Sequence, residues 1–214
     1  MRALIFANGV LRPSNKVKKL IRPDDLLIAA DGGALHLREL GLTPRLVVGD
    51  FDSLDPETLA ELEQAGATLE RHSPRKDQTD LELALDLAVS AGAAEIQVWG
   101  ALGRRWDMTV ANIMLPTSSK YDGVKISIID DDQEFWPVRG GGSSEFFGRP
   151  GDVFSLIPLG GEARGVTLEG LEYPLVEATL PLGSTWGVSN VLVGEKGRVS
   201  LAAGLLLCIL NRKS

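Results

Sequence analysis

The chain has 214 residues, of which 44% are hydrophobic and 24% charged, and its formal net charge is −7. This composition is typical of a globular protein of one or two domains. The negative charge argues against a nucleic-acid-binding protein, which needs a basic face. Apolar runs fall short of the roughly 18 residues of a membrane helix, and the N-terminus does not resemble a signal peptide. We therefore expect a cytoplasmic protein that binds neither nucleic acid nor membrane.

The first two predicted strands both end in polar turns. Residues 3–7 form an apolar run closed by the turn pair Asn8-Gly9. Residues 26–30 form a second buried strand that leads into Asp31-Gly32-Gly33. Glycines at such a point let the backbone approach a ligand closely. The other interpretation of Asp31 is a helix cap and turn, and the sequence leaves both open.

The stretch Gly49-Asp50-Phe51-Asp52-Ser53 follows residues 46–48, a β-branched run that predicts a buried strand. If the chain stays extended, the two carboxylates point to one side at roughly 6–7 Å. At an effective dielectric constant near 20, such charges repel by roughly 2–3 kcal/mol. A hard cation such as Mg²⁺ prefers carboxylate oxygens and would remove that repulsion. The alternative is an Asp turn followed by an N-cap.

A further acidic motif opens a later helix. Asp55-Pro56 predicts the start of one helix, and residues 68–71 predict a short strand. In Lys76-Asp77-Gln78-Thr79-Asp80, Thr79 forms a capping box with Glu82. Helix capping explains Thr79 and Glu82, but it does not explain why Lys76, Asp77 and Asp80 occur together. A lysine at a helix N-terminus can hold a phosphate, whereas the alternative is a well-capped surface helix.

The strand predicted over residues 95–100 leads into Gly103-Arg104-Arg105-Trp106-Asp107 and a helix that contains Asn112. Two arginines at this point suit phosphate oxygens, and solvated arginines in an ordinary turn are the alternative. Acidic residues thus follow several strands, and ligands bind at the carboxyl ends of parallel strands. We therefore predict an α/β domain with a parallel sheet over residues 1–120.

From residue 121 on, helical periodicity fades, and short apolar runs alternate with Gly, Pro and Asn turns. These runs are residues 125–129, 152–157, 191–193 and 198–201. We predict an antiparallel β-sandwich over residues 121–214. A glycine-flanked loop in this half contains Trp186, Ser189 and Asn190, which suit a planar heterocycle, and Trp186 can stack on a cationic ring. A buried core tryptophan is the alternative.

In this order, the motifs resemble those of the thiamine pyrophosphokinase family. The family pattern reads Asp-Gly-Gly-Ala, Gly-Asp-Phe-Asp-Ser, Lys-Asp-x-Thr-Asp, a Gly-Arg-x-Asp loop before an Ala-Asn-Ile helix, and a late Ser-Asn loop. The matching residues are 31–34, 49–53, 76–80, 103–113 and 189–190. The sequence departs from the pattern in three places: Leu35 replaces an Asn, Arg104 replaces a glycine, and Trp106-Asp107-Met108 replaces Leu-Asp-His.

The resemblance implies a Rossmann-like catalytic domain, a thiamine-binding β-sandwich and a homodimer with its active site at the subunit interface. It implies an enzyme that moves a pyrophosphoryl group from ATP to the hydroxyl of thiamine, giving thiamine diphosphate and AMP. Two alternatives remain open. One is a diphosphokinase acting on a pterin-type hydroxymethyl heterocycle, and the other is a non-catalytic protein on the same fold that binds thiamine or a nucleotide.

The resemblance and the residue chemistry together assign roles to the motif residues. We expect Asp50, Asp52 and Asp80 to hold Mg²⁺. Lys76, with Arg105 as a second candidate, would stabilise charge on the transferred group or the leaving AMP. Asp77 is the candidate for orienting the hydroxyl or accepting its proton. The remaining nucleotide-binding assignments are Asp31, Gly32, Thr79, Arg105, Asp107 and Asn112. The thiamine-binding assignments are Trp186, Ser189 and Asn190.

Overall fold

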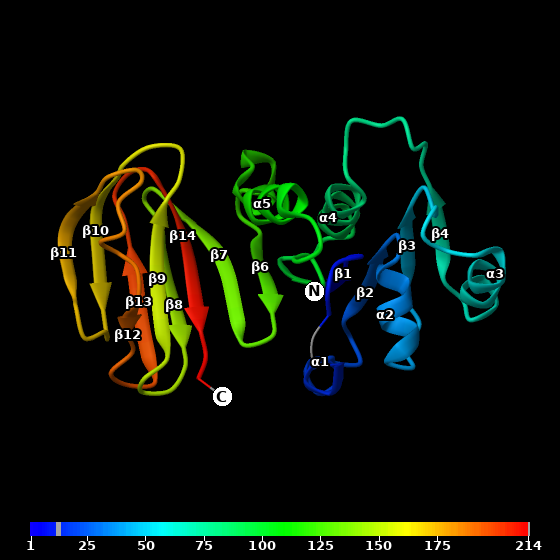
Figure 1. The fold of residues 1–214 in the computed structure, drawn as a ribbon, viewed down its shortest axis with the longest axis horizontal. Coiled ribbons are helices and arrows are strands. Elements are labelled where there is room, and N and C mark those ends of the chain that lie inside the picture. The colour runs from blue at the N-terminus through cyan, green and yellow to red at the C-terminus, as the bar shows by residue number, and fades with distance from the viewer. Residues whose placement is uncertain (12–13, 214) are drawn as a thin grey trace. The chain divides into compact units, whose positions relative to one another are not determined.

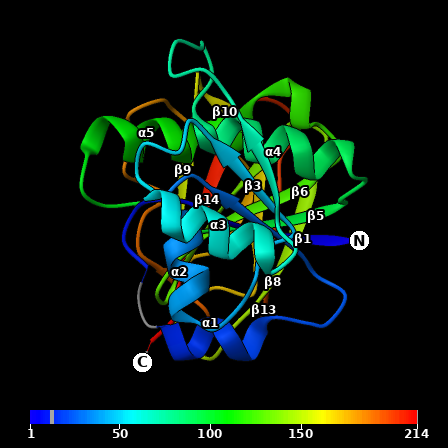
Figure 2. The ribbon, with the colours of Figure 1, turned by 90° about the vertical axis from the view of Figure 1, so that its right-hand side faces the viewer.

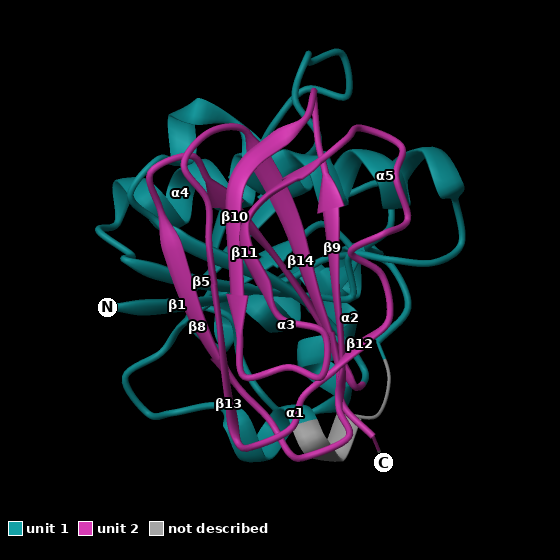
Figure 3. Cartoon of the chain, turned by 90° about the vertical axis from the view of Figure 1, so that its left-hand side faces the viewer, with its two compact units in different colours: residues 1–131 teal, residues 132–214 magenta. Residues whose placement is uncertain are grey.

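The computed structural model describes residues 1–11 and 14–213 and divides the chain into two compact units (Figures 1 and 3). The first unit covers residues 1–131 and the second covers residues 132–214. Within the described residues, every helix is too short or too polar to cross a membrane.

The first unit alternates strands with helices. Its strands are β1 (Arg2–Phe6), β2 (Leu26–Ala30), β3 (Leu46–Gly49), β4 (Thr68–Arg71), β5 (Glu95–Trp99) and β6 (Lys125–Asp130). Its helices are α1 (Ser14–Leu20), α2 (Gly33–Glu39), α3 (Pro56–Gln64), α4 (Asp80–Ser90) and α5 (Trp106–Met114), followed by the short 3₁₀ turns η1 (Leu115–Thr117) and η2 (Ser119–Tyr121). The strands pair in parallel in the order β6-β5-β1-β2-β3-β4.

Helices lie on both faces of this parallel sheet (Figures 1 and 2). Crossover connections between parallel strands are right-handed, so connections that run in opposite directions place their helices on opposite faces. In Figure 1, α4 and α5 lie above the strands, and α1 and α2 lie below them. The carboxyl ends of the strands share one edge, so the turns that follow them meet there.

Local sequence signals set the helix starts in the first unit. The side chain of Asp55 caps α3 by accepting a hydrogen bond from Thr58 N at 2.7 Å. Thr79 caps α4 in the same way, accepting from Glu82 N at 3.2 Å. Both predicted helix starts are confirmed, as are the strands predicted over residues 26–30 and 68–71.

One strand lies in a different unit from the one predicted. The run 125–129 was expected in the antiparallel half, but it forms β6 and pairs in parallel with β5, with Ile126 opposite Ile96. The first compact unit therefore extends to Asp131, beyond the predicted boundary at residue 120. A short apolar run rich in β-branched residues looks the same in a parallel and in an antiparallel sheet. Its own residues do not specify the strand with which it pairs, because that depends on contacts distant in sequence.

The second unit contains two antiparallel sheets. Its strands are β7 (Gln133–Arg139), β8 (Ser143–Phe147), β9 (Val153–Pro158), β10 (Ala163–Glu169), β11 (Leu175–Leu180), β12 (Asn190–Val191), β13 (Lys196–Ser200) and β14 (Leu205–Asn211). They pair in the orders β12-β9-β14-β7 and β11-β10-β13-β8. Both sheets contribute to one apolar cluster that includes Phe154, Val166 and the fully buried Cys208. The antiparallel pairing predicted for this half is confirmed within these strands.

Candidate active site

One pocket of about 460 Å³ is lined by the turns after β1, β2, β3 and β5 and by the start of α4. It brings together eight of the residues predicted from the sequence: Asp31, Asp50, Asp52, Lys76, Thr79, Asp80, Arg105 and Asn112. Three of the predicted catalytic and nucleotide-binding residues lie outside its lining: Gly32, Asp77 and Asp107. The lining also contains four polar residues that were not predicted: Asn8, Ser53, Gln78 and Arg104.

A group of three carboxylates lies in this pocket. Asp31, Asp50 and Asp52 each offer an oxygen, and these oxygens all lie within 4.8 Å of one another. The expected extended chain between Asp50 and Asp52 is wrong, because Phe51 has a φ of +66°. The turn lets Asp52 N donate to Asp50 Oδ1 at 3.2 Å. A turn rather than a strand therefore brings these carboxylates together.

Asp31 is the buried member of the group, with 4% of its surface exposed and a φ of +47°. It does not cap the following helix, since the N-cap of α2 is Gly32 and no side chain caps it. Within the described part of the chain, Asp31 Oδ1 is buried without a hydrogen-bond partner. A buried carboxylate oxygen without a donor is costly unless a cation compensates it. The helix-cap interpretation of Asp31 is therefore wrong, and the oxygen suits a metal ion.

Asp80, predicted to share the metal with Asp50 and Asp52, lies beside this group. Its Oδ1 lies 2.7 Å from Lys76 Nζ, and a Cβ built on Gly49 would lie 3.3 Å from the same oxygen. Burial raises the pKa of the Asp80 carboxyl, the Lys76 ammonium opposes this, and the charges of Asp31 and Asp50 act with burial. The ends of β2 and β3 and the start of α4 therefore concentrate negative charge around one lysine.

Further contacts from Asn8, Ser53 and Arg71 hold the acidic turn in place. Asn8 Nδ2 donates to Ser53 Oγ at 2.9 Å, and Ser53 Oγ donates to Asp52 Oδ1 at 3.1 Å. On the other side, Arg71 donates to the backbone oxygen of Asp50 at 3.0 Å, and its guanidinium lies 4.7 Å from the centre of the Phe51 ring. Asn8 was not predicted as a site residue because Asn-Gly is also a common turn pair.

The loop after β5 is held by its own side chains. Arg105 donates twice to Asp107, from Nε to Oδ1 at 3.1 Å and from Nη2 to Oδ2 at 2.5 Å. This pairing lowers the pKa of Asp107 to about 2. Asn112 is buried and donates to the backbone oxygen of Ala101 at 2.7 Å. Asp107 and Asn112 therefore support the loop through contacts within the chain.

The predicted thiamine-binding residues lie in the second unit. Trp186 is 62% exposed, so the core-tryptophan interpretation is wrong. Ser189 has a φ of +63°, and its N–H donates to Ser155 Oγ at 3.0 Å. The amide of Asn190 is occupied by the backbone of Tyr173, accepting at 3.0 Å and donating at 2.7 Å. The loop thus presents an indole, while Asn190 anchors its base.

Comparison with known proteins adds independent evidence. The family model described as "Thiamin pyrophosphokinase, catalytic domain" matches residues 17–128, which is more than half of the chain. A second model, "Thiamin pyrophosphokinase, vitamin B1 binding domain", matches residues 146–206. The chain belongs to the thiamin pyrophosphokinase family. The two matched domains fall within the first and second compact units respectively.

Individual relatives agree with this family assignment. The chain is 33% identical over 208 residues to the thiamine pyrophosphokinase of Bacillus subtilis, covering 96% of each sequence. Among solved structures, it is similar to the thiamine pyrophosphokinase from Bacillus subtilis, with a TM-score of 0.90 at 30% identity over the full length of both chains. It is also similar to the enzyme from Geobacillus thermodenitrificans, with a TM-score of 0.86 at 31% identity, covering 100% of this chain and 99% of that one.

Proposed function

We propose that this protein transfers a pyrophosphoryl group from ATP to the hydroxyl of thiamine, giving thiamine diphosphate and AMP. In this reaction the hydroxyl oxygen bonds to the β-phosphorus of ATP, and the bond from that phosphorus to the α–β bridging oxygen breaks. The bridging oxygen leaves with AMP, and the hydroxyl proton is lost. The observation that carries the proposal is the convergence of Asp31, Asp50, Asp52 and Asp80 with Lys76 in one pocket. Family membership supports the choice of substrates.

The acidic group fits a divalent cation, which we propose to be Mg²⁺. Its carboxylate oxygens are close together, and the buried Asp31 Oδ1 has no hydrogen-bond donor among the described residues. Mg²⁺ prefers such oxygens and is usually bound by one or two carboxylates together with substrate phosphates. When bound, the ion would neutralise charge on the phosphate oxygens. Asp31, Asp50 and Asp52 would hold it, with Asp80 beside them.

The chain's other groups would position the reactants and stabilise charge. Phosphoryl transfer depends on alignment and charge stabilisation more than on covalent help. Lys76, whose side chain is 17% exposed and faces the pocket, would stabilise the transferred group or the leaving AMP. Arg105 is less available because Asp107 occupies its guanidinium. Asp77 is exposed and does not line the pocket, so its role as proton acceptor stays a prediction.

The second unit would supply the thiamine-binding surface. The exposed Trp186 indole can stack on the cationic thiazolium ring, and Ser189 lies in the same loop. In this proposal the first unit is a Rossmann-like nucleotide-binding domain and the second is a β-sandwich. The cytoplasmic location stays a prediction.

We also propose that the protein is a homodimer with its active site at the subunit interface. Trp106, Val110 and Met114 lie four residues apart on α5 and are 84%, 58% and 40% exposed, which forms an apolar stripe suited to a second subunit. Sedimentation equilibrium of the wild-type chain and of Val110→Glu tests this. A wild-type monomer would contradict it.

The activity is tested by measuring AMP release from ATP with and without thiamine at varied Mg²⁺. We expect AMP and thiamine diphosphate in equal amounts, dependent on both thiamine and the metal. Trp186→Ala is expected to raise the KM for thiamine and leave that for ATP unchanged. Transfer to a hydroxymethyl pterin in place of thiamine would overturn the substrate assignment. Tight binding of thiamine without AMP release would overturn the activity.

A further inference from the structure

Arg104 is a strained residue at the edge of the candidate active site. Its φ is +59°, in the left-handed region that glycine adopts without strain and arginine does not. The N–H of Arg105 donates to the oxygen of Gly103 at 2.7 Å, which closes a three-residue γ-turn around Arg104. A γ-turn with a positive central φ is rare and strained. Backbone strain of this kind clusters at active sites and ligand-binding segments.

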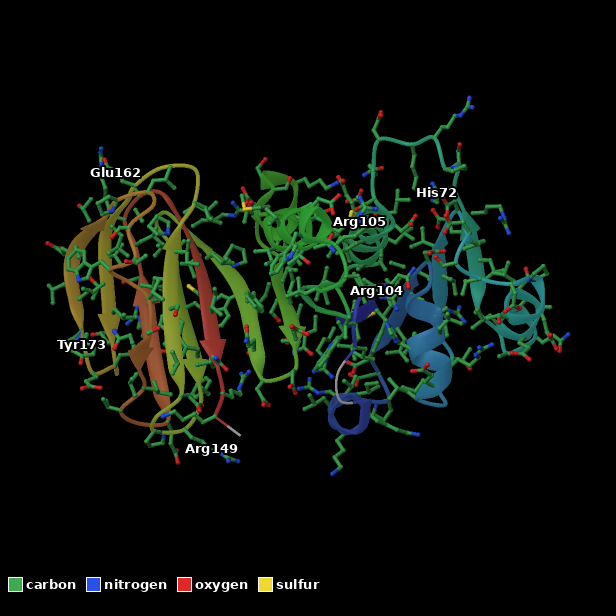
Figure 4. All side chains as sticks on the ribbon, in the orientation of Figure 1. His72, Arg104, Arg105, Arg149, Glu162 and Tyr173 are labelled. Carbon is green, nitrogen blue, oxygen red and sulfur yellow. The ribbon has the colours of Figure 1, made fainter. Side chains whose placement is uncertain are left out.

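The guanidinium of Arg104 is available to a ligand. Among the described residues, no side chain or backbone group forms a hydrogen bond or ion pair with it, and Arg104 lines the pocket. Its neighbour Arg105 also lines the pocket, but Asp107 holds it in a double hydrogen bond. The two arginines, both labelled in Figure 4, therefore differ in availability although they are adjacent in sequence.

We propose that Arg104 binds the phosphate chain of the nucleotide beyond its α-phosphate, and that the strained turn presents its guanidinium for that contact. This inference rests on the proposed function, which places a triphosphate in the same pocket. Phosphates suit the planar guanidinium, which can donate two parallel hydrogen bonds to their oxygens. The carboxylates of Asp31, Asp50 and Asp52 would hold the phosphates through a cation, whereas Arg104 would bind them directly. Arg105 then acts as a support of the loop.

Two substitutions separate the charge of Arg104 from its strain. Arg104→Met removes the charge and keeps a side chain at the strained φ, and Arg104→Gly removes both. We expect calorimetric affinity for ATP and for inorganic tripolyphosphate, each with Mg²⁺, to fall about tenfold or more in both variants. Affinity for AMP should stay within about twofold of wild type. Arg104→Gly should also raise the melting temperature, because glycine relieves the strain.

Two matched variants control for charge. Arg104→Lys keeps a cation at the strained position and should retain more affinity for ATP than Arg104→Met, although a lysine cannot form the double hydrogen bond. Arg75→Met removes an exposed arginine that does not line the pocket, and it should bind ATP and tripolyphosphate like wild type. Equal losses of affinity in Arg75→Met and Arg104→Met would mean that only net charge matters and would overturn the proposal.

The outcomes also separate this inference from the proposed function. If Arg104→Met and Arg104→Gly bind ATP and tripolyphosphate like wild type, or if AMP binding falls equally, the inference is overturned, even when the wild type converts thiamine. If tripolyphosphate binding depends on Arg104 but wild type releases no AMP with thiamine, the inference stands and the proposed activity fails. A wild-type chain that binds no tripolyphosphate would overturn the inference as well.

Discussion

The two units place their unusual features in different locations. In the first, three of the four described non-glycine residues with a positive φ, Asp31, Phe51 and Arg104, lie in turns that follow parallel strands, beside the acidic pocket. In the second, both sheets bury apolar side chains in one cluster, and the notable polar feature is a loop with the exposed Trp186. Both units therefore pack an apolar core, and the first also gathers charged and strained residues around one pocket.

The largest effect we expect is on the stability of the second unit. Phe154 is fully buried, and its ring stacks on Phe146 with centroids 4.1 Å apart. Phe154→Ala should lower the free energy of unfolding by about 3–5 kcal/mol, because it removes buried surface and leaves a cavity. Urea denaturation measures this. Phe147→Ala, which removes a ring that is 63% exposed, is the control and should cost less than about 1 kcal/mol. Equal losses would contradict the packing argument.

The next largest effect should be on turnover in the first unit. Asp52 is exposed and belongs to the carboxylate group, so Asp52→Ala should lower the rate of AMP formation by about a hundredfold or more. The free energy of unfolding should change by less than about 0.5 kcal/mol, because the hydrogen bond lost to Ser53 is exposed and a repulsive charge is lost with it. Steady-state assays and denaturation measure the two effects. Glu63→Ala, an exposed acidic residue on α3, should change neither. A folded Asp52→Ala protein with near-normal turnover would remove the metal assignment.

The fold was largely predictable because its signals are local. Strand β2 and the capped start of α4 each follow from a few neighbouring residues. Strand β6 was assigned to the wrong half because its partner, β5, is specified by packing and not by its own residues. Likewise, the sequence favoured an extended chain through Phe51. Its positive φ could not be predicted, because bulky aromatic residues rarely adopt that conformation.

The acidic residues of the candidate site were predictable from the sequence, whereas its hydrogen-bond donors, the arginines and Asn8, were less so. Asp31, Asp50 and Asp80 follow or precede regular elements at one sheet edge, so topology alone brings them together. The choice between Arg104 and Arg105 was not predictable, because it depends on which of them reaches Asp107. The role of Asn8 was not predictable for a similar reason, since its hydrogen bond to Ser53 joins the turn after β1 to the turn after β3.

A smaller effect tests whether stability and chemistry are separable within the first unit. Thr79→Ala and Asp55→Ala each remove a helix cap and should each cost about 1 kcal/mol of unfolding free energy. Thr79 lines the pocket and fixes the start of α4, where Asp80 pairs with Lys76, so Thr79→Ala should also lower turnover. Asp55→Ala should not. Thr79→Ser keeps the hydroxyl and should restore both properties. Equal turnover losses from the two cap removals would show that stability alone limits activity.

The smallest effect concerns an exposed ion pair in each unit. Arg105 lowers the pKa of Asp107 from an ordinary 3.8 to about 2, and Lys196 lowers that of Glu145 in the second unit. A carboxyl whose pKa is lower in the folded chain than in the unfolded chain stabilises the fold at pH values above its ordinary pKa, which is 3.8 for Asp107. For Asp107 this contribution is lost as the pH falls through about 2. Both pairs are exposed and should weaken with salt.

A carbon-detected NMR titration of Asp107 tests this shift before strong acid is reached. At pH 3 a carboxyl with a pKa of about 2 is about nine-tenths ionised, whereas one with an ordinary pKa is mostly protonated. Arg105→Gln should move the Asp107 pKa back toward 3.8 and leave Glu145 unchanged. An ordinary pKa in the wild-type chain would mean that Arg105 is not held by Asp107. The two arginines of the loop would then be equally free to bind phosphate, and the distinction between a supporting and a binding arginine would be lost.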